Sequence, residues 1–371
     1  MMRAAAAIIF SLLLTDAASA QTAIDPSWQF GALVDVAALL DPNDPANHEF
    51  RNRGTTSHVN ELDVNVAAAY IRKDVSKHSR IGFEATVQTG KDVELYGFSA
   101  VAPNLGGADA LRHLGPTDVT YLAPISSGLT IQGGIFTSLI GYDSLYAKDN
   151  FAYTRPWGAD YTPYLMMGVN ASYPISSRLT ATAFVVNGYF HLAHANDAPS
   201  VGGQLSWRID GGTTIKQTVL CGSHQAETAL ELWRVLSDTI LERKSNAATM
   251  AVEYQVGSER VATDGRPRAL WMSAQAPLHW QANAAWALTV RPEFAWDRDG
   301  RWIGAPQSVA AVTGTIEYRL PTSIAAVVRA EYRIDSARDS GGGFFAGADD
   351  HLIATQDLFI VAAIVTFAAR R

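Results

Sequence analysis

Charged side chains recur at every second position in segments near the C-terminal end of the chain. The set is Arg291, Glu293, Glu317, Arg319, Arg329, Glu331 and Arg333. Side chains two residues apart on an extended chain point to the same side, so acids and bases here share one face. Such a face could form cross-strand ion pairs that rigidify a wall. It could also present a basic strip opposite an acidic loop, with an electric field across the water between them.

A second group of charges lies in the stretch 139–163. Its members are Asp143, Lys148, Asp149, Arg155 and Asp160, interleaved with Tyr142, Tyr146, Phe151, Tyr153 and Trp157. The aromatic rings could pack against a wall or stack on a sugar. One interpretation is a loop that folds across the charged face and forms a constriction beside it. An ordinary surface loop explains the same residues equally well.

The segment from Val309 to Ile334 indicates what kind of element positions these charges. Aliphatic residues alternate with polar ones on both sides of Leu320-Pro321-Thr322. A period of two predicts strands, here a hairpin. Each strand is about twelve residues long, whereas strands of soluble proteins usually have about five or six. An aliphatic face opposite a face of Glu and Arg is typical of a wall between lipid and water.

The whole chain repeats this pattern. We predict sixteen strands, with fourteen or eighteen as alternatives, near 28–40, 60–72, 79–90, 117–125, 129–138, 164–174, 178–188, 200–209, 213–222, 232–242, 247–257, 268–278, 283–297, 308–319, 322–335 and 354–367. The connections alternate between long and short. Short periplasmic turns, long extracellular loops and an even strand number are features of transmembrane antiparallel up-and-down β-barrels. The fold class is therefore all-β, with 21–371 as a single barrel domain.

Aromatic residues support the same arrangement. Five of them precede short turns in the predicted outward register: Tyr70, Tyr121, Tyr173, Trp207 and Tyr318. Trp286 and Trp296 share one face of a single strand. Tyr and Trp concentrate where hydrocarbon meets water, so we expect these rings to form girdles around the barrel.

Two segments are ambiguous. Residues 225–244 could form an amphipathic helix whose apolar side carries Leu232, Val235, Leu236 and Ile240. We interpret them as a loop and a strand because the strand count must stay even. The last strand is apolar on both faces, and periodicity does not assign its register.

Residues 1–20 resemble a secretory signal peptide, with Arg3, an apolar run from Ala4 to Leu14 and the small residues Ala18-Ser19-Ala20. We therefore expect export across the inner membrane and a bacterial outer-membrane location. The net charge of −7 argues against a nucleic-acid partner. Cys221 is the single cysteine, which excludes a disulfide framework within the chain.

Catalytic and metal chemistry have weak support. His191 and His194 are spaced i, i+3, which suits metal binding on a helix, but only Asp197 is near in sequence and solvated histidines are the simpler interpretation. No G-x-S-x-G nucleophile motif is present. A barrel hydrolase could still assemble distant Ser, His and Asp residues. We expect no enzyme activity, no cofactor and no metal.

Several motifs resemble a known family. They include Pro45-Ala46-Asn47-His48-Glu49, Asn60-Glu61-Leu62-Asp63-Val64-Asn65, the stretch from Gly134 to Tyr142, the stretch from Lys148 to Arg155, and Val186-Asn187-Gly188-Tyr189. In these the chain resembles the OmpL-like β-barrel porin family 2 of Gram-negative bacteria, most clearly from Pro45 to about Ile209. Barrels of this kind commonly end in an aromatic residue, whereas Phe367 here is followed by Ala-Ala-Arg-Arg.

The resemblance implies an outer-membrane porin, and three expectations follow. The first is a water-filled channel for passive diffusion of small hydrophilic solutes or ions. The second is a non-conducting, plugged barrel with a structural or surface-interaction role, and the third a barrel hydrolase. The partners would be outer-membrane lipid, the solutes and, in a homotrimer, two further copies of the chain.

Overall fold

The structure of the protein is a computed structural model that describes residues 28–95, 108–125, 127–190, 192, 198–223, 230–322, 325–339 and 341–370. The expected signal peptide lies outside these residues, as do His191, His194 and Asp197.

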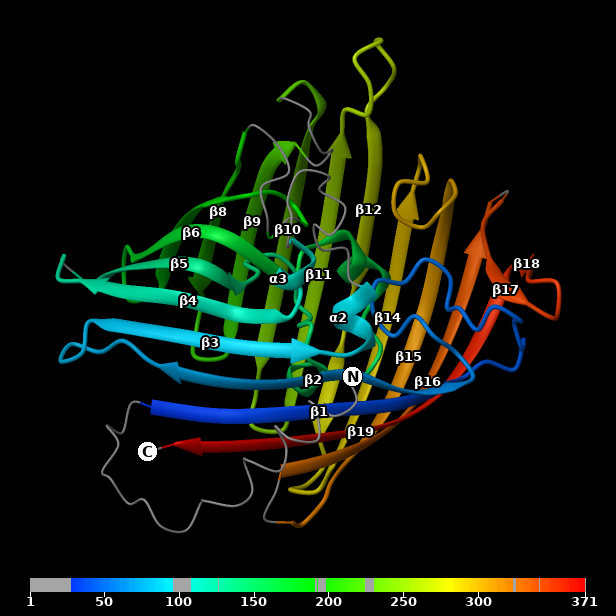
Figure 1. Ribbon diagram of the computed structural model, residues 1–371, viewed down its shortest axis with the longest axis horizontal. Helices are drawn as coiled ribbons and strands as arrows, with labels where there is room; N and C mark the ends of the chain where they lie inside the picture. Colours follow the sequence, from blue (N-terminus) through cyan, green and yellow to red (C-terminus); the bar gives the residue numbers. More distant parts are fainter. Residues whose placement is uncertain are drawn as a thin grey trace.

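One antiparallel sheet forms the body of the molecule (Figure 1). Its strands are β1 (Trp28–Leu40), β2 (Glu61–Lys73), β3 (Ile81–Thr89), β4 (Leu114–Ala123), β5 (Leu129–Thr137), β6 (Leu165–Pro174), β7 (Leu179–Val186), β8 (Ser200–Arg208), β9 (Thr213–Ser223), β10 (Trp233–Lys244), β11 (Ala248–Glu259), β12 (Ala269–Gln275), β13 (Leu278–Gln281), β14 (Trp286–Asp297), β15 (Gln307–Arg319), β16 (Ala325–Arg338) and β19 (Thr355–Arg370). Each strand pairs with its neighbours in the chain, as the alternating long and short connections predict.

The sheet closes on itself. β1 pairs with β19 from Gln29–Arg370 to Leu40–Phe359, so the first and last strands lie side by side (Figure 1). β12 and β13 together occupy one strand position between β11 and β14. The 17 strands of the sheet therefore fill sixteen positions around the barrel. This confirms the prediction of a closed sixteen-strand barrel.

The twelfth strand position begins as β12, is interrupted at Ala276 and Pro277, and resumes as β13. Proline has no N–H to donate, so a ladder cannot run through it without an irregularity. The sequence placed the end of this strand at residue 278, whereas β13 continues to Gln281. Residues 233–244 form β10 and pair with β9 and β11, so the helical alternative for this segment is wrong.

Inward and outward faces alternate as expected along most strands. On β14 the side chains of Trp286, Leu288, Val290 and Phe294 are exposed, and those of Ala287, Thr289, Arg291 and Glu293 are buried. β15 and β16 show the same alternation. An apolar outer surface with charged residues beneath it is stable in hydrocarbon and would not be in water.

Four of the five expected aromatics, Tyr121, Tyr173, Trp207 and Tyr318, lie on the outward register, and the Tyr318 ring is 4.5 Å from that of Trp286. Tyr70 does not. The β1–β2 register shifts between Asp35 and Val36. The extra residue in β2 reverses its faces, as a β-bulge does. Tyr70 consequently points into the lumen, where its ring covers Gly31.

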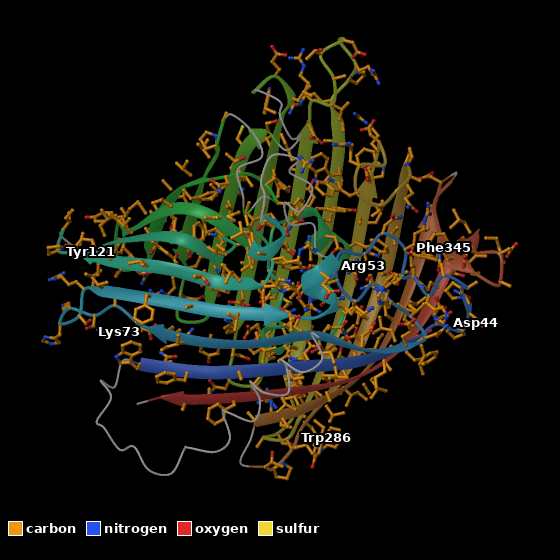
Figure 2. All side chains as sticks on the ribbon, viewed as in Figure 1. Asp44, Arg53, Lys73, Tyr121, Trp286 and Phe345 are labelled. Atoms are coloured by element: carbon orange, nitrogen blue, oxygen red, sulfur yellow. The ribbon has the colours of Figure 1, made fainter. Side chains whose placement is uncertain are left out.

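Long connections gather at one end of the barrel and short turns at the other (Figure 2). Lys73 and Tyr121 lie at the short-turn end, and Asp44 and Phe345 at the long-loop end. The long connections contain α2 (Lys91–Leu95), α3 (Ala108–Leu111), the 3₁₀ turn η4 (Leu230–Leu232) and the hairpin of β17 (Phe344–Ala346) and β18 (His351–Ile353). No helix in the described parts of the chain is long and apolar enough to cross a membrane.

Candidate functional site

The connection between β5 and β6, residues 138–164, runs through the lumen and is called the lumen loop below. It contains two 3₁₀ turns, η2 (Ala147–Asp149) and η3 (Trp157–Tyr161). Tyr153, Thr154 and Arg155 are fully buried, as are Tyr161 and Ala147. Such burial is unusual for a loop, because irregular backbone must find hydrogen-bond partners away from water.

Three arginines of the barrel wall supply donors for the loop carbonyls. Arg329 on β16 donates to the carbonyl oxygens of Ala147 at 2.8 Å, Asn150 at 2.6 Å and Ala152 at 3.3 Å. Arg291 on β14 donates to Thr154 O at 2.6 Å. Arg333 on β16 donates to Arg155 O at 3.1 Å. A guanidinium carries five N–H donors in a fixed plane, so one arginine can hold several carbonyls at once.

Carboxylates of the same wall accept from the loop amides. Glu331 accepts the N–H of Tyr153 at 2.6 Å, the N–H of Thr154 at 3.0 Å and the hydroxyl of Thr154. Glu293 accepts the N–H of Trp157 at 2.6 Å. Bonds to an ionised acceptor are about twice as strong as neutral ones. The loop is thus held through its backbone, by side chains of both signs.

The wall charges also pair with one another. The nitrogen–oxygen distances are 2.9 Å for Arg329–Glu317, 2.8 Å for Arg333–Glu293, 2.7 Å for Arg333–Asp335 and 3.5 Å for Arg291–Glu293. All of these side chains are nearly inaccessible to solvent. Arg319 differs, because its side chain is 48% exposed although it pairs with Glu317 at 3.0 Å. Of the seven charges singled out in the sequence, six are therefore buried and one, Arg319, is partly exposed.

The charged residues of the loop itself divide in a similar way. Lys148 and Asp149 pair at 2.7 Å and remain partly exposed. Asp143 accepts from the side-chain amide of Gln275 at 2.6 Å. Arg155 is buried against Asp92 at 3.4 Å, and Asp160 is 3.0 Å from Arg53.

Arg53 and Asp92 hold the loop from the other side, and sequence reasoning missed both. Arg53 belongs to the β1–β2 connection and also donates to Arg155 O at 2.6 Å. Its guanidinium lies 4.6 Å from the Trp157 ring, a cation–π contact. Asp92 lies in α2 and accepts the N–H of Thr56 at 2.7 Å. Neither residue belongs to a periodic pattern, so no local signal indicates these contacts.

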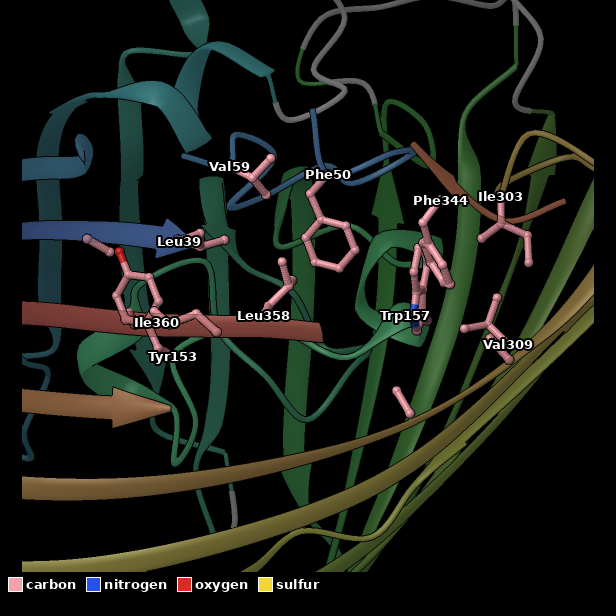
Figure 3. Close-up of a cluster of buried hydrophobic side chains, with 14 of the residues drawn as sticks. Leu39, Phe50, Val59, Tyr153, Trp157, Ile303, Val309, Phe344, Leu358 and Ile360 are labelled. Carbon is pink, nitrogen blue, oxygen red and sulfur yellow. The ribbon is translucent and has the colours of Figure 1, made fainter. Parts of the chain in front are cut away.

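Buried aromatic and aliphatic side chains from several loops meet inside the barrel (Figure 3). Phe50, Trp157, Phe344 and Ile303 come from four different connections and meet in one cluster. The rings of Phe50 and Trp157 are 5.7 Å apart in an edge-to-face arrangement. The cluster joins the lumen loop to three neighbouring loops.

Two cavities remain beside the loop. The first, about 350 Å³, lies towards the short-turn end and is lined by residues including Tyr70, Lys148, His279, Arg319 and Phe151. The second, about 260 Å³, is lined by residues including Tyr142, Lys216, Glu242 and Lys244. Asp149, Asn150 and Phe151 line both, so this part of the loop separates two hollows that contain charged side chains.

The Asp92–Arg155 pair predicts a pH dependence. Burial raises the pKa of Asp92 to about 7, although the Arg155 guanidinium opposes the shift. The folded state therefore holds this proton more tightly than the unfolded state. The contribution of Asp92 to stability is present in full below about pH 4 and is lost as the pH rises to about 7. Asp92→Asn carries a permanently neutral side chain and should gain stability relative to the parent protein as the pH rises.

The measurement is the midpoint temperature of unfolding in detergent for the parent protein and Asp92→Asn, between about pH 5 and about pH 8. We expect the difference, parent minus variant, to fall as the pH rises to about 7 and then to level off. Asp264→Asn, in the exposed β11–β12 connection, is a control that should show a flat difference. A difference that rises with pH for Asp92→Asn would contradict the prediction.

Among the described residues, the His and carboxylate side chains close enough to share a metal ion lie outside the lumen loop, at His58, Glu61 and Asp63. The lumen loop and its wall offer hydrogen-bonding and charged groups around a constriction. A closed barrel with an apolar exterior, a charged interior and a loop folded across it defines the class of outer-membrane β-barrel channels.

The chain belongs to the OmpL-like beta-barrel porin-2 family, whose sequence profile matches residues 27–367. It is accordingly a bacterial outer-membrane porin, a channel protein. No curated protein matches the chain.

The fold is similar to that of solved outer-membrane channels. An anion-selective porin from Comamonas acidovorans superposes with a TM-score of 0.57 at 9% identity, covering 92% of this chain and 99% of the other. The channel DcaP of Acinetobacter baumannii gives 0.56 at 10% identity, covering 92% and 96%. OmpT of Vibrio cholerae, in its in-vitro folded form, gives 0.54 at 11% identity, covering 94% and 100%.

Proposed function

We propose that this porin passes small hydrophilic solutes by passive diffusion, and that the lumen loop is its constriction. The observation that carries the proposal is the anchoring of the loop backbone by buried Arg and Glu residues of β14–β16. A freely moving surface loop would not need this many charged partners. Asp149, Asn150 and Phe151, which border both cavities, stand at the narrowest part of the path.

The proposal assigns two roles to the charges. Arg291, Glu293, Glu317, Arg329, Glu331 and Arg333 fix the constriction in place. Arg319 and Lys148 face the first cavity, and Lys216 and Lys244 face the second, so these four act on the passing solute. Acidic partners lie beside three of them, at Glu317, Asp149 and Glu242. The field along the path is therefore mixed in sign.

The direct experiment is reconstitution of the folded full chain into a planar lipid bilayer. We expect stepwise current increments as single barrels insert, with a conductance below that of an unobstructed barrel of this strand number. A protein that inserts and is folded, by its electrophoretic shift on heating, yet stays silent at all voltages would overturn the proposal.

A plugged barrel with a surface role is the second candidate. The cluster of Phe50, Trp157, Phe344 and Ile303 favours it, because these buried side chains bring four connections together inside the barrel. Silence of the parent protein together with conduction after the lumen loop is removed would support this candidate over the first.

We further propose one barrel domain after a cleaved signal peptide, assembly as a homotrimer and no catalysis. The trimeric form of OmpT from Vibrio cholerae has a similar fold, with a TM-score of 0.52 at 9% identity. The small outward residues Ala181, Ala183, Gly203 and Gly314 would allow close approach of neighbouring barrels. Mass measurement of the detergent-solubilised complex tests the trimer, and a panel of ester and lipid substrates tests the absence of hydrolysis.

A further inference from the structure

The β1–β2 connection folds into a small hairpin at the long-loop end. Glu49 and His58 form a β-bridge, the Phe50 N–H donates to Ser57 O at 2.7 Å, and the Val59 N–H donates to His48 O at 2.9 Å. The return arm leads directly into β2, which starts at Glu61. Glu61 and Asp63 are two residues apart on that strand, so their carboxylates project to the same side. His58, which precedes the strand, lies beside both carboxylates.

The three side chains converge closely. His58 Nδ1 is 3.1 Å from Asp63 Oδ2, and one donor atom from each of His58, Glu61 and Asp63 lies within 4.8 Å of the others. Nitrogen and oxygen ligands bind Zn²⁺ at about 2.0 to 2.2 Å, so two ligands at 90 to 110° are about 3.0 to 3.4 Å apart. The His58–Asp63 separation already fits that geometry. Glu61 is about half-exposed and can rotate to complete it.

We propose that His58, Glu61 and Asp63 form a binding site for a divalent transition-metal ion, with Zn²⁺ as the probe. One imidazole and two carboxylates favour such an ion over Ca²⁺ or Mg²⁺, which take oxygen ligands. His48 stands next to this set, with Nδ1 3.9 Å from Glu61 Oε1. That nitrogen also lies 3.2 Å from Val59 O, so His48 is held by its own backbone contact and is not one of the three ligands.

The site would act on the constriction through one short path. A bound ion would fix the β1–β2 connection to the start of β2. The same connection carries Arg53, which binds Arg155 O and Asp160 in the lumen loop. Metal binding would therefore restrict motion of the group that holds the lumen loop from the long-loop side. This consequence rests on the proposed function, whereas metal binding itself does not.

Zinc affinity of the folded full chain in detergent tests the site, by competition with a chromophoric chelator. We expect one Zn²⁺ per chain, and a loss of affinity of at least about tenfold in each of His58→Ala, Asp63→Asn and Glu61→Gln. Glu61 is the safest position for folding because its side chain is half-exposed. The electrophoretic shift on heating must be retained in every variant that is compared.

His351→Ala is the matched control. His351 also pairs with a carboxylate, Asp349, at 2.8 Å, and it is exposed in another long connection, but among the described residues it belongs to no group of three ligands. We expect its affinity to stay within about twofold of the parent protein. Equal affinities for the parent and the three site variants, or a loss in His351→Ala as large as theirs, would overturn the proposal.

A second measurement separates the site from the channel. Limited proteolysis should cleave the β1–β2 connection more slowly when Zn²⁺ is added, in the parent protein and not in Glu61→Gln. The result depends on no conductance, so a silent barrel leaves it interpretable. Protection that is the same in both proteins would count against the site.

Discussion

Removing residues 142–160 and joining the ends with a short Gly-Ser linker should raise the single-channel conductance severalfold. The lumen loop lies across the interior, and its buried residues occupy space that ions would otherwise use. Conductance grows with the cross-section of the narrowest part of a water-filled pore. The measurement is the size of the current steps in a planar bilayer under molar salt.

The matched control deletes residues 263–267 of the β11–β12 connection, which are exposed and stand away from both cavities. Its conductance should equal that of the parent protein. The larger deletion leaves buried Arg and Glu side chains without their loop partners. Phe151→Ala therefore serves as a milder variant. Phe151 borders both cavities and stacks on His279 at 4.2 Å, so a modest rise is expected. Unchanged conductance in both folded variants would overturn the assignment of the constriction to the lumen loop.

The alternation of residue types predicted the barrel because each strand must satisfy two solvents at once. Where every second residue is apolar, as from Trp286 to Phe294, the register follows directly. The prediction of inward and outward faces fails where a strand contains an extra residue or is interrupted. At the β1–β2 register shift the backbone gains a residue, and Tyr70 moves from the outer face to the lumen. Pro277 interrupts the strand between β12 and β13, because proline has no N–H to donate to the backbone hydrogen bonds of the sheet.

The alternation along a strand predicts which side chains face inward, but it does not predict which residues pack over them. Arg291, Arg329 and Arg333 are visible in the sequence as a basic strip, for which cross-strand ion pairing is the simpler interpretation and a field acting on solutes is the alternative. Besides their acidic partners on the wall, all three donate to backbone carbonyls more than a hundred residues away in the chain. Arg53 and Asp92, which contact the lumen loop from its other side, lie in irregular connections. Contacts of this kind depend on tertiary packing and have no local sequence signature.

Reversing the charge of Arg333 should prevent the barrel from folding, whereas reversing Arg319 should change ion selectivity. Arg333 makes a bidentate contact with Asp335 at 2.7 and 2.8 Å, pairs with Glu293 at 2.8 Å and donates to Arg155 O. Removing one partner of a buried ion pair costs about 3 to 5 kcal/mol. Arg333→Glu would also place a third carboxylate between two others, which adds repulsion at a buried position.

Arg319 has a different environment, although it lies on the same wall. Its side chain is 48% exposed and lines the first cavity. Exposed ion pairs contribute at most about 1 kcal/mol, so Arg319→Glu should fold normally. Cations would then be favoured near this end of the path, which a shift of the reversal potential in a salt gradient measures. Refolding yield, scored by the electrophoretic shift on heating, compares the two variants directly. Equal yields would mean that Arg333 is not a structural anchor, and an unshifted reversal potential in Arg319→Glu would remove this residue from the path of the ions.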